Sequence, residues 1–353
     1  MPDLVVAGAG MAGLVAAAEA RERGAEVVLL EKSDEPGGSM RLSSGVVWRY
    51  RDFERFRREC PGGDPALQRL VHDRLDGDLR WLERLGARVL ERATGNPATS
   101  GARFSVPSLV RALVRRAGEI RVRRALRELP SRTPVVLATG GFQADRDLVR
   151  RHITSEADAL LLRGTPWSTG DGMRLALDAG AALTDGMDEF YGRNMPAPPA
   201  RVGETQFVEL AQLYAHHATV ENAAGERYVP RTWSEIDVVQ WTARQPRARA
   251  TYRIPLAELD ARIRDRTVGE MVDAAERAGA PVRRGRDGTV VEVVAGITTT
   301  LGGLKVDPAA RAARHVYAAG CDVGGLSTGG YSSGLAAALV LGRVAAASAL
   351  EER

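Results

Sequence analysis

The feature that most constrains this chain is a glycine-rich turn near its beginning, Gly8-Ala9-Gly10-Met11-Ala12-Gly13. The turn follows the short apolar run Leu4 to Ala7, which is typical of a buried strand, and precedes a predicted helix from Leu14 to Arg23. Val27 to Leu30 predicts a second buried strand. A strand, a tight glycine turn, a helix and another strand form the βαβ unit that binds dinucleotides.

Each glycine of this turn has a separate physical role. Gly8 permits the tight turn, Gly10 lets the backbone approach a pyrophosphate, and Gly13 lets the helix pack closely. The pyrophosphate would face the helix N-terminus, where N–H groups attract negative charge. Glu31 ends the second strand about 20 residues further on, so it is predicted to accept both ribose hydroxyls. Its charge would repel a 2′-phosphate, which disfavours NADP.

A second stretch rich in glycine and hydroxyl groups begins at Glu31. It continues through Pro36-Gly37-Gly38-Ser39 to Ser43-Ser44-Gly45, and it is long enough to wrap the diphosphate and ribityl chain of FAD. We therefore expect FAD rather than NAD. The predicted FAD contacts in this stretch are Lys32, Gly37, Gly38, Ser39, Ser43, Ser44 and Gly45.

Later glycine-rich turns also follow predicted strands. Pro134 to Ala138 is a buried strand that stops at Thr139-Gly140-Gly141, and Thr169-Gly170-Asp171-Gly172 opens a helix. The strand His315 to Ala319 leads into a glycine-rich loop, Gly320 to Gly334, which opens the last helix. We infer that these turns face the same ligand.

The chain length of 353 residues exceeds what one hydrophobic core usually holds, so two lobes are expected. Segments 64–92 and 107–129 are predicted helical. From about Met187 the sequence becomes a mixture of proline, aromatic and polar residues without a simple period. We therefore expect residues 1–186 and 296–353 to form one domain and residues 187–295 to be inserted into it.

Composition excludes several classes of function. The formal charge of +4 is spread along the chain, so no nucleic-acid partner is expected. Cys60 and Cys321 have neither a disulfide pattern nor metal-ligand spacing, and no HExxH motif occurs, so no metal site is predicted. The apolar run Leu335 to Leu350 is too short to span a membrane and contains Arg343. A cytoplasmic location without membrane contact is the expectation.

In these motifs and their order the chain resembles the fumarate reductase and succinate dehydrogenase flavoprotein superfamily, which includes the 3-ketosteroid dehydrogenases. The resemblance implies an α/β fold, with a Rossmann-like FAD-binding domain and an inserted α+β capping domain. It runs from the GxGxxG turn through Gly37-Gly38-Ser39, Ala138-Thr139-Gly140-Gly141, Thr169-Gly170-Asp171-Gly172 and Ala318-Ala319-Gly320 to Gly334-Leu335 and Gly342-Arg343.

The resemblance also implies roles for particular residues. Gly140 and Gly141 would lie near the adenosine, and Asp171 would contribute to the FAD site. Gly334 and Leu335 would present the last helix to flavin N1 and O2, where a helix dipole stabilises the negative charge of reduced flavin. Relatives have glutamate after the Ala-Gly pair that ends at Gly320. This chain has Cys321 and then Asp322, so either Asp322 makes the ribityl contact or that contact is lost. Because no histidine occurs near Ser39, the FAD should be non-covalent.

The substrate side departs from the fumarate reductases. An ungapped reading places Glu235 at the position of their catalytic arginine, and their histidine motifs are replaced. A dicarboxylate substrate is therefore disfavoured. Tyr331 is the first catalytic candidate, because a phenol a few positions before the flavin-contacting helix can polarise a carbonyl or relay a proton. Packing on the flavin without chemistry is an equal alternative. Tyr191 and Arg193 are predicted to line the cleft, with an ordinary hinge as the alternative.

Other aromatic and basic residues of the inserted segment are expected to be structural. His216 and His217 are adjacent and so point apart, which disfavours joint action. Tyr252 is expected in the core of the inserted domain. Packing roles are also expected for Trp233 and Trp241, and for Trp48 of the first domain.

Together these features predict an FAD-dependent oxidoreductase that transfers hydride between flavin N5 and a carbon next to a carbonyl. The substrate would be a small carbonyl compound that is dehydrogenated at the α,β-bond or reduced as an ene. No second GxGxxG occurs, so oxygen or a separate electron carrier would complete the cycle rather than NAD(P)H. Two alternatives stay open, a flavin oxidase or redox-neutral isomerase, and a non-catalytic FAD-binding protein. No oligomeric state is predicted.

Overall fold

The computed structural model describes residues 1–230 and 235–352, which fall into two compact units. Unit 1 comprises Met1–Asp145, Thr165–Met187 and Thr300–Arg353, and unit 2 comprises Arg146–Gly164 and Asp188–Thr299. The chain thus divides within a few residues of positions 187 and 295, where the sequence suggested boundaries. Residues 146–164 were expected in the first domain, but they belong to unit 2. Trp233 lies outside the described residues.

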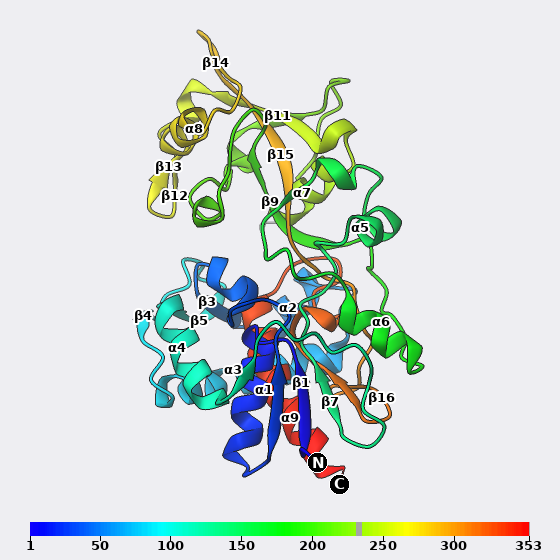
Figure 1. Cartoon of the computed structure of the whole chain (residues 1–353). Helices are drawn as coiled ribbons and strands as arrows, with labels where there is room; N and C mark the ends of the chain where they lie inside the picture. Colours follow the sequence, from blue (N-terminus) through cyan, green and yellow to red (C-terminus); the bar gives the residue numbers. More distant parts are fainter. Residues whose placement is uncertain (231–234, 353) are drawn as a thin grey trace. The chain divides into compact units, whose positions relative to one another are not determined.

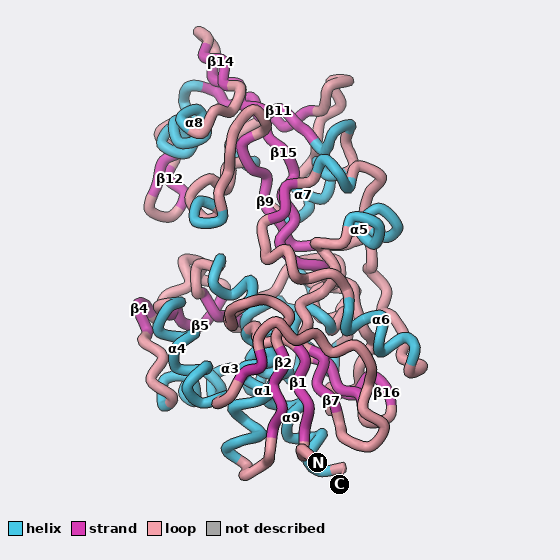
Figure 2. Tube along the Cα trace, in the orientation of Figure 1, coloured by secondary structure: helices cyan, strands magenta, loops and turns pink. Residues whose placement is uncertain are grey.

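A six-stranded, mostly parallel sheet forms the centre of unit 1. Its central strands are apolar and buried, and Val5 of the first strand pairs with Val28 on one side and Val135 on the other. Figure 2 shows β1, β2 and β7 side by side, each followed by a loop at the same end. The strand order is β16 (Arg311–Ala313), β17 (Val316–Ala318), β7 (Val135–Leu137), β1 (Leu4–Ala7), β2 (Val27–Leu30) and β6 (Ile120–Arg121), with only β16 antiparallel to its neighbour.

Two helices that follow glycine turns lie beside this sheet, α1 (Met11–Glu22) and α9 (Gly334–Glu351) (Figure 1). Every residue of α1 from Met11 to Ala20 is buried, and all of them except Glu19 lack a polar side chain, as expected for a helix covered on all sides. The sequence suggested that this apolar segment is too short to cross a membrane, but α9 is long and apolar enough to do so, although 61% of it is buried within the protein. Inside unit 1 it packs against α1 and α3 (Pro65–Arg84).

The rest of unit 1 corrects two helix predictions. The first predicted helix, 64–92, is α3 only as far as Arg84, and Val89–Glu91 is a strand, β4. The second, 107–129, is α4 (Val106–Ala117), which stops at Gly118 because that residue has φ of +73°. The further elements are β3 (Val46–Tyr50) and β5 (Thr99–Phe104), which form an antiparallel sheet with β4, and the helices α2 (Phe53–Glu59) and α6 (Asp171–Asp178).

The long strand β15 (Gly288–Thr300) organises unit 2, because most other strands of the unit pair with it. The hydrophobic core of unit 2 contains Tyr214 and Tyr252. Both side chains are fully buried, which agrees with the core position expected for Tyr252. The sheet contains β10 (Thr219–Glu221), β11 (Arg249–Pro255), β15 and β14 (Val282–Arg284), with β8 (Leu161–Leu162) and β9 (Phe190–Pro196) also paired to β15. A hairpin, β12 (Arg262–Ile263) and β13 (Arg266–Thr267), and the helices α5 (Arg146–His152), α7 (Ile236–Ala243) and α8 (Val268–Arg277) complete the unit.

Tertiary contacts explain why residues 146–164 belong to unit 2. Within this segment β8 pairs in parallel with Gly296–Ile297 of β15. The Thr154 hydroxyl donates to the Ala243 carbonyl at 2.8 Å, at the end of α7. No local pattern marks such a return, because each contact joins residues far apart in the chain.

Candidate functional site

The glycine turn between β1 and α1 closes on itself. A Cβ atom at Gly13 would lie 1.8 Å from the Gly8 carbonyl oxygen, and one at Gly8 would lie 2.2 Å from the Ala138 carbonyl oxygen. At Gly10, by contrast, nothing lies within 4 Å of the position that a Cβ would take. Gly8 and Gly13 therefore serve packing, and Gly10 borders open space in which a ligand can approach the backbone.

The start of α1 supplies hydrogen-bond donors to that open space. Gly10 is its N-cap, and no side chain caps the helix. The N–H groups of the first turn have no acceptor within the helix, so they form an anion site together with the positive end of the helix dipole. This is the arrangement that a pyrophosphate requires.

The second predicted loop packs directly on the first. Gly37 donates its backbone N–H to the Ala9 carbonyl at 2.8 Å, and a Cβ at Gly38 would lie 3.2 Å from the Gly10 Cα. Ser39 Oγ accepts the Thr165 N–H at 3.1 Å. The structure thus brings the two loops together, as a site for one extended ligand requires.

Hydroxyl groups further along this loop hold the loop itself. The Ser43 hydroxyl donates to the Met40 carbonyl at 2.7 Å and accepts the Gly45 N–H at 3.2 Å. Ser44 is half-buried. The FAD contacts predicted for Ser43, Ser44 and Gly45 stay predictions.

Glu31 is fixed by the backbone on both sides of its carboxylate. One oxygen accepts the Ala9 N–H at 2.6 Å and the other accepts the Ser33 N–H at 2.8 Å. The residue is only 8% exposed. Each oxygen keeps a further lone pair, so the carboxylate is oriented in advance for hydroxyl donors such as those of a ribose.

Lys32 and Asp171, both predicted FAD contacts, form an ion pair. Lys32 Nζ lies 2.7 Å from Asp171 Oδ2 and donates to Thr169 Oγ1 at 2.6 Å. Asp171 is the first residue of α6. The pair joins two of the predicted motifs across more than 130 residues of sequence.

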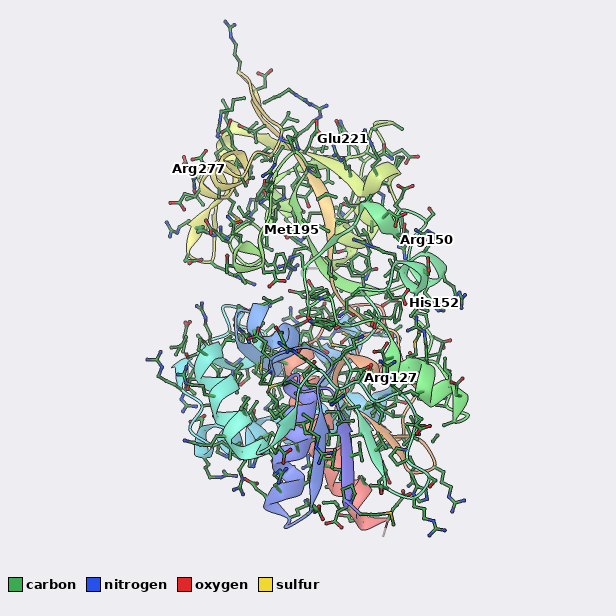
Figure 3. The ribbon with its side chains drawn as sticks, in the orientation of Figure 1. Arg127, Arg150, His152, Met195, Glu221 and Arg277 are labelled. Carbon is green, nitrogen blue, oxygen red and sulfur yellow. The ribbon has the colours of Figure 1, made fainter. Side chains whose placement is uncertain are left out.

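A cavity of about 750 Å³ adjoins this ion pair. Part of its wall was not predicted from the sequence, because residues 122–129, predicted as the end of a helix, form a loop after β6. That loop is held against Glu31, since Arg124 donates its N–H to the Glu31 carbonyl at 2.8 Å. Figure 3 labels Arg127 of this wall. The lining residues are Lys32, Asp34, Arg123, Ala125, Leu126, Arg127, Trp167, Asp171, Arg174 and Leu175.

Asp322 clamps the loop that follows β7. Its carboxylate accepts the backbone N–H groups of Thr139 and Gly141, the latter at 3.1 Å, and the Thr139 hydroxyl at 3.0 Å. Burial raises the pKa of this carboxyl above its ordinary range, although those donors oppose the shift. Asp322 therefore holds Gly140 and Gly141 in place. Its predicted cofactor contact stays a prediction.

The start of α9 also borders open space. Nothing lies within 4 Å of a Cβ built at Gly334, and Ser333 caps the helix by accepting the Ala336 N–H at 3.3 Å. A Cβ atom built at Gly320, two residues after β17, would lie 2.9 Å from the Ala12 Cβ. The turns after β1 and β17 are therefore packed together, and Leu335 lies in the first turn of α9.

Tyr331 belongs to an aromatic cluster in unit 1. Its carbonyl accepts the Tyr50 hydroxyl at 2.8 Å, and its ring meets the Trp48 ring edge-on with centroids 5.8 Å apart. Trp48 also packs on Tyr50. This cluster holds the segment before α9 against β3, which agrees with the packing role expected for Trp48.

The other two catalytic candidates lie on β9 of unit 2. Tyr191 and Arg193 are half-buried and share one side of the strand, with the Arg193 guanidinium 5.2 Å from the Tyr191 ring centre. Asn194, on the opposite side, is buried and donates to Thr242 Oγ1 and to the Tyr252 hydroxyl, both at 2.9 Å. Tyr191 and Arg193 therefore stay candidates, while Asn194 is part of the core.

Glu235 is a buried charged residue of unit 2. It is 7% exposed, has φ of +57°, and accepts the Ala215 N–H at 2.8 Å. The sequence marked it only as a departure from a family motif. The adjacent residues His216 and His217 have separate surroundings. Burial raises the pKa of the Glu235 carboxyl and the charge of His216 lowers it, whereas His217 Nδ1 lies 2.7 Å from Glu258 Oε2. No described group of three or more His, Cys, Asp or Glu residues could hold a metal ion.

These features together define a dinucleotide-binding protein. They are a mostly parallel sheet with a glycine turn after β1, the hydrogen-bonded carboxylate of Glu31 after β2, and a second open helix N-terminus at α9. The family model described as FAD binding domain matches residues 3–103 and 55–334. The chain belongs to this family, and its cofactor is FAD.

Known proteins similar to this chain are reductases and dehydrogenases. The chain is 26% identical to a fumarate reductase (cytochrome) of Shewanella frigidimarina over 52% of its own length and 40% of the relative's. It is 25% identical to a vinyl phenol reductase of Lactiplantibacillus plantarum, covering 65% of this chain and 54% of the relative. The chain therefore spans about half the length of these curated relatives.

A solved structure extends the likeness of fold over the whole chain. The 3-ketosteroid-Δ4-(5α)-dehydrogenase of Rhodococcus jostii RHA1, in complex with 4-androstene-3,17-dione, matches with a TM-score of 0.73 and 20% identity. The match covers 99% of this chain and 96% of that chain. This likeness confirms the predicted fold class, and the family model together with the curated relatives confirms the predicted flavoprotein superfamily.

Proposed function

We propose that this protein is an FAD-dependent oxidoreductase acting on a C–C bond next to a carbonyl, by α,β-dehydrogenation or ene reduction. FAD, when bound, supplies the hydride acceptor or donor. The observation that carries the proposal is the joined cradle, in which Glu31 and Gly37 both hydrogen-bond Ala9 of the glycine turn. Fumarate reductase, vinyl phenol reductase and ketosteroid dehydrogenase, the relatives' names, support chemistry at a C–C bond.

The residues present fit FAD along its length. We infer that the pyrophosphate lies against Gly10 and the start of α1, with the ribose at Glu31 and the adenine in the cavity beside Lys32. The flavin end would face Gly334, where the helix dipole of α9 favours negative charge. Residues near Ser39 include no histidine, so we propose that the FAD is non-covalent.

The proposed substrate is a small neutral carbonyl compound rather than a dicarboxylate. The fumarate reductase-type histidine and arginine clamps are missing from this sequence, and vinyl phenol and the bound androstenedione of the two relatives are neutral. We propose that oxygen or a separate electron carrier completes the cycle. The proposed cytoplasmic location rests on two cysteines that form no disulfide.

FAD content is the first test of this proposal. We expect the purified protein to be yellow and to release FAD when it is denatured, because no covalent link is proposed. The measurement is an absorbance spectrum before and after denaturation and filtration. A colourless protein that takes up no FAD on reconstitution would contradict the proposal.

A second test concerns Tyr331. We expect Tyr331→Phe to slow flavin reduction or reoxidation by a carbonyl compound by roughly a hundredfold, because acid–base or polarising groups contribute about that much. FAD should stay bound, since the backbone carbonyl that holds Tyr50 is unchanged. Anaerobic stopped-flow spectroscopy measures the rate. The control is Tyr317→Phe, a buried tyrosine on β17 whose hydroxyl donates to the Ser348 carbonyl at 3.5 Å. Equal rates in wild type and Tyr331→Phe would remove Tyr331 from the mechanism.

A further inference from the structure

The loop that leads into α9 is held by the segment between α2 and α3 of the same unit. We call residues 324–333 the pre-helix loop. The Gly62 N–H donates to the Thr328 carbonyl at 3.1 Å, and the Asp64 N–H donates to the Gly325 carbonyl at 2.6 Å. These bonds fix the path of the backbone through the pre-helix loop.

Gln68 of α3 is the side chain at the centre of this contact. It is fully buried, and its amide nitrogen donates to the Cys60 carbonyl at 3.0 Å and to the Leu326 carbonyl at 2.9 Å. Its amide oxygen accepts Nη1 of Arg57 at 2.6 Å. An amide supplies both donors and an acceptor, so glutamine satisfies two carbonyls and a guanidinium at once.

Two glycines let the segment and the pre-helix loop approach each other closely. A Cβ at Gly63 would lie 2.1 Å from the Gln68 amide nitrogen, and one at Gly330 would lie 1.7 Å from the Glu59 carbonyl oxygen. Both positions therefore exclude a side chain. Close packing prevents the pre-helix loop from moving toward the segment, and the hydrogen bonds oppose movement away from it.

The pre-helix loop contains or adjoins the residues that the proposed function brings to the flavin. Tyr331 lies within it, and its last residue, Ser333, caps α9, which begins at Gly334. A helix N-terminus stabilises the negative charge of reduced flavin only if its N–H groups are held in position. A displaced loop would move Tyr331 and these N–H groups together.

We propose that Gln68 is a positioning residue for the flavin end of the cofactor. Its amide holds the Leu326 carbonyl, and the pre-helix loop passes this constraint to Tyr331 and to the first turn of α9. The inference rests on the proposed function for the position of the flavin, and it adds a residue that acts through the loop.

A glutamine that only stabilised the fold would behave differently. Its removal would leave buried carbonyls unpaired and lower the stability of the protein in either case. The midpoint potential of the bound flavin, however, changes only if the groups that surround the flavin move. The potential therefore separates a positioning role from a purely structural one.

The experiment measures the midpoint potential of bound FAD by equilibration with redox dyes under anaerobic conditions. We expect Gln68→Leu to lower the potential, because displaced N–H groups of α9 no longer favour the charge of reduced flavin. The ratio of affinities for reduced and oxidised FAD should fall about fivefold to thirtyfold, which is the size of a helix-terminus interaction. A tenfold change corresponds to about 30 mV for a two-electron couple.

The matched control is Gln212→Leu, which makes the same chemical change in unit 2. Gln212 is 1% exposed, and its amide donates to the Leu210 carbonyl at 2.7 Å. We expect this variant to unfold at a lower temperature than the wild type but to keep the wild-type potential. Thermal unfolding of both glutamine variants shows whether their losses of stability are comparable.

Two milder variants decide the question if Gln68→Leu does not fold. Gln68→Glu keeps the shape and the contact with Arg57, but an ionised carboxylate repels the Leu326 carbonyl instead of donating to it. Tyr50→Phe removes the hydroxyl that holds the Tyr331 carbonyl at 2.8 Å, a second bond to the same loop. Both variants should lower the potential at pH 8.

The outcomes separate the inference from the proposed function. A wild-type potential in folded, FAD-bound Gln68→Leu would overturn the inference, however much stability is lost. An equal fall in Gln68→Leu and Gln212→Leu would also overturn it, because the effect would then come from general loosening. If the potential falls only in the variants of the pre-helix loop contact but no carbonyl compound reacts with the bound flavin, the inference stands and the proposed reaction fails.

Discussion

Gly10→Ala is expected to lose FAD while keeping the fold, whereas Gly13→Ala is expected to damage both. A methyl group at Gly10 meets no protein atom within 4 Å, and the φ of −75° suits alanine. The methyl group would instead occupy the space of the pyrophosphate. Overpacking of this kind costs about 1–3 kcal/mol, which is roughly a tenfold to hundredfold loss of affinity. At Gly13 the added Cβ would lie 1.8 Å from the Gly8 carbonyl oxygen, so the turn itself must open.

Titration of the apoprotein with FAD, followed by flavin fluorescence, gives the affinity, and thermal unfolding of the apoprotein gives the stability. Gly77→Ala is the matched control, because its Cβ would contact only the end of the Arg80 side chain at 3.9 Å. That variant should bind FAD as the wild type does. Wild-type affinity in Gly10→Ala would mean that the pyrophosphate does not approach this backbone.

The second large effect concerns Arg343 on α9, where Arg343→Met is expected to destabilise unit 1 by about 3–5 kcal/mol. Arg343 Nε lies 2.7 Å from Glu19 on α1, and its Nη1 pairs with Asp78 on α3. The carboxylate side chains are only 7% and 4% exposed. Without the arginine, two buried negative charges remain close together, and that cost is comparable to the whole stability of a typical domain.

The pH dependence gives this prediction its sign. Burial already raises the pKa of Asp78, and the Arg343 charge is the largest opposing effect. In Arg343→Met the pKa should rise further, so stability is greatest at low pH and falls as pH rises through the new value. Urea unfolding followed by circular dichroism at pH 5 and pH 8 measures the difference.

Two further variants check this explanation. Arg92→Met removes an exposed ion pair with Glu83 and should leave the midpoint unchanged. Replacing all three partners by apolar residues, Glu19→Leu, Asp78→Leu and Arg343→Met, should restore much of the lost stability, because no buried carboxylate remains and Arg23, the second partner of Glu19, is exposed. If the single variant Arg343→Met is as stable as the wild type at pH 8, the proposed role of the cluster of Glu19, Asp78 and Arg343 is ruled out.

Local patterns were sufficient for the βαβ unit and for the strands β1, β2, β7 and β17 of the parallel sheet, but not for β6, which lies inside a segment predicted to be helical. The apolar runs at Leu4, Val27 and Val135 each became a strand of that sheet. Helix lengths were less reliable where arginine-rich segments kept an apolar period beyond the helix. Gly118 ended α4 because of its left-handed backbone, and the residues after Arg84 turned into the strand β4.

The inserted unit was harder to predict because its strands pair across long stretches of chain. Leu161–Leu162 joins a sheet whose central strand begins at Gly288, and a two-residue strand has no period of its own. Glu235 was visible in the sequence only as an unusual residue at a family position. Its burial among Ala215, His216 and Arg193 depends on folding of three separate segments.

Residue patterns alone predicted the dinucleotide-binding turn, since the requirements at Gly8, Gly10 and Gly13 and the position of Glu31 are local consequences of two strands, one turn and one helix. Tertiary structure alone decided how that turn is completed into a cradle. Asp322 holds the loop at Thr139, and Lys32 pairs with Asp171, in each case across more than 130 residues. Such contacts have no sequence period, because they depend on where distant strands end in the sheet rather than on the spacing of neighbouring residues.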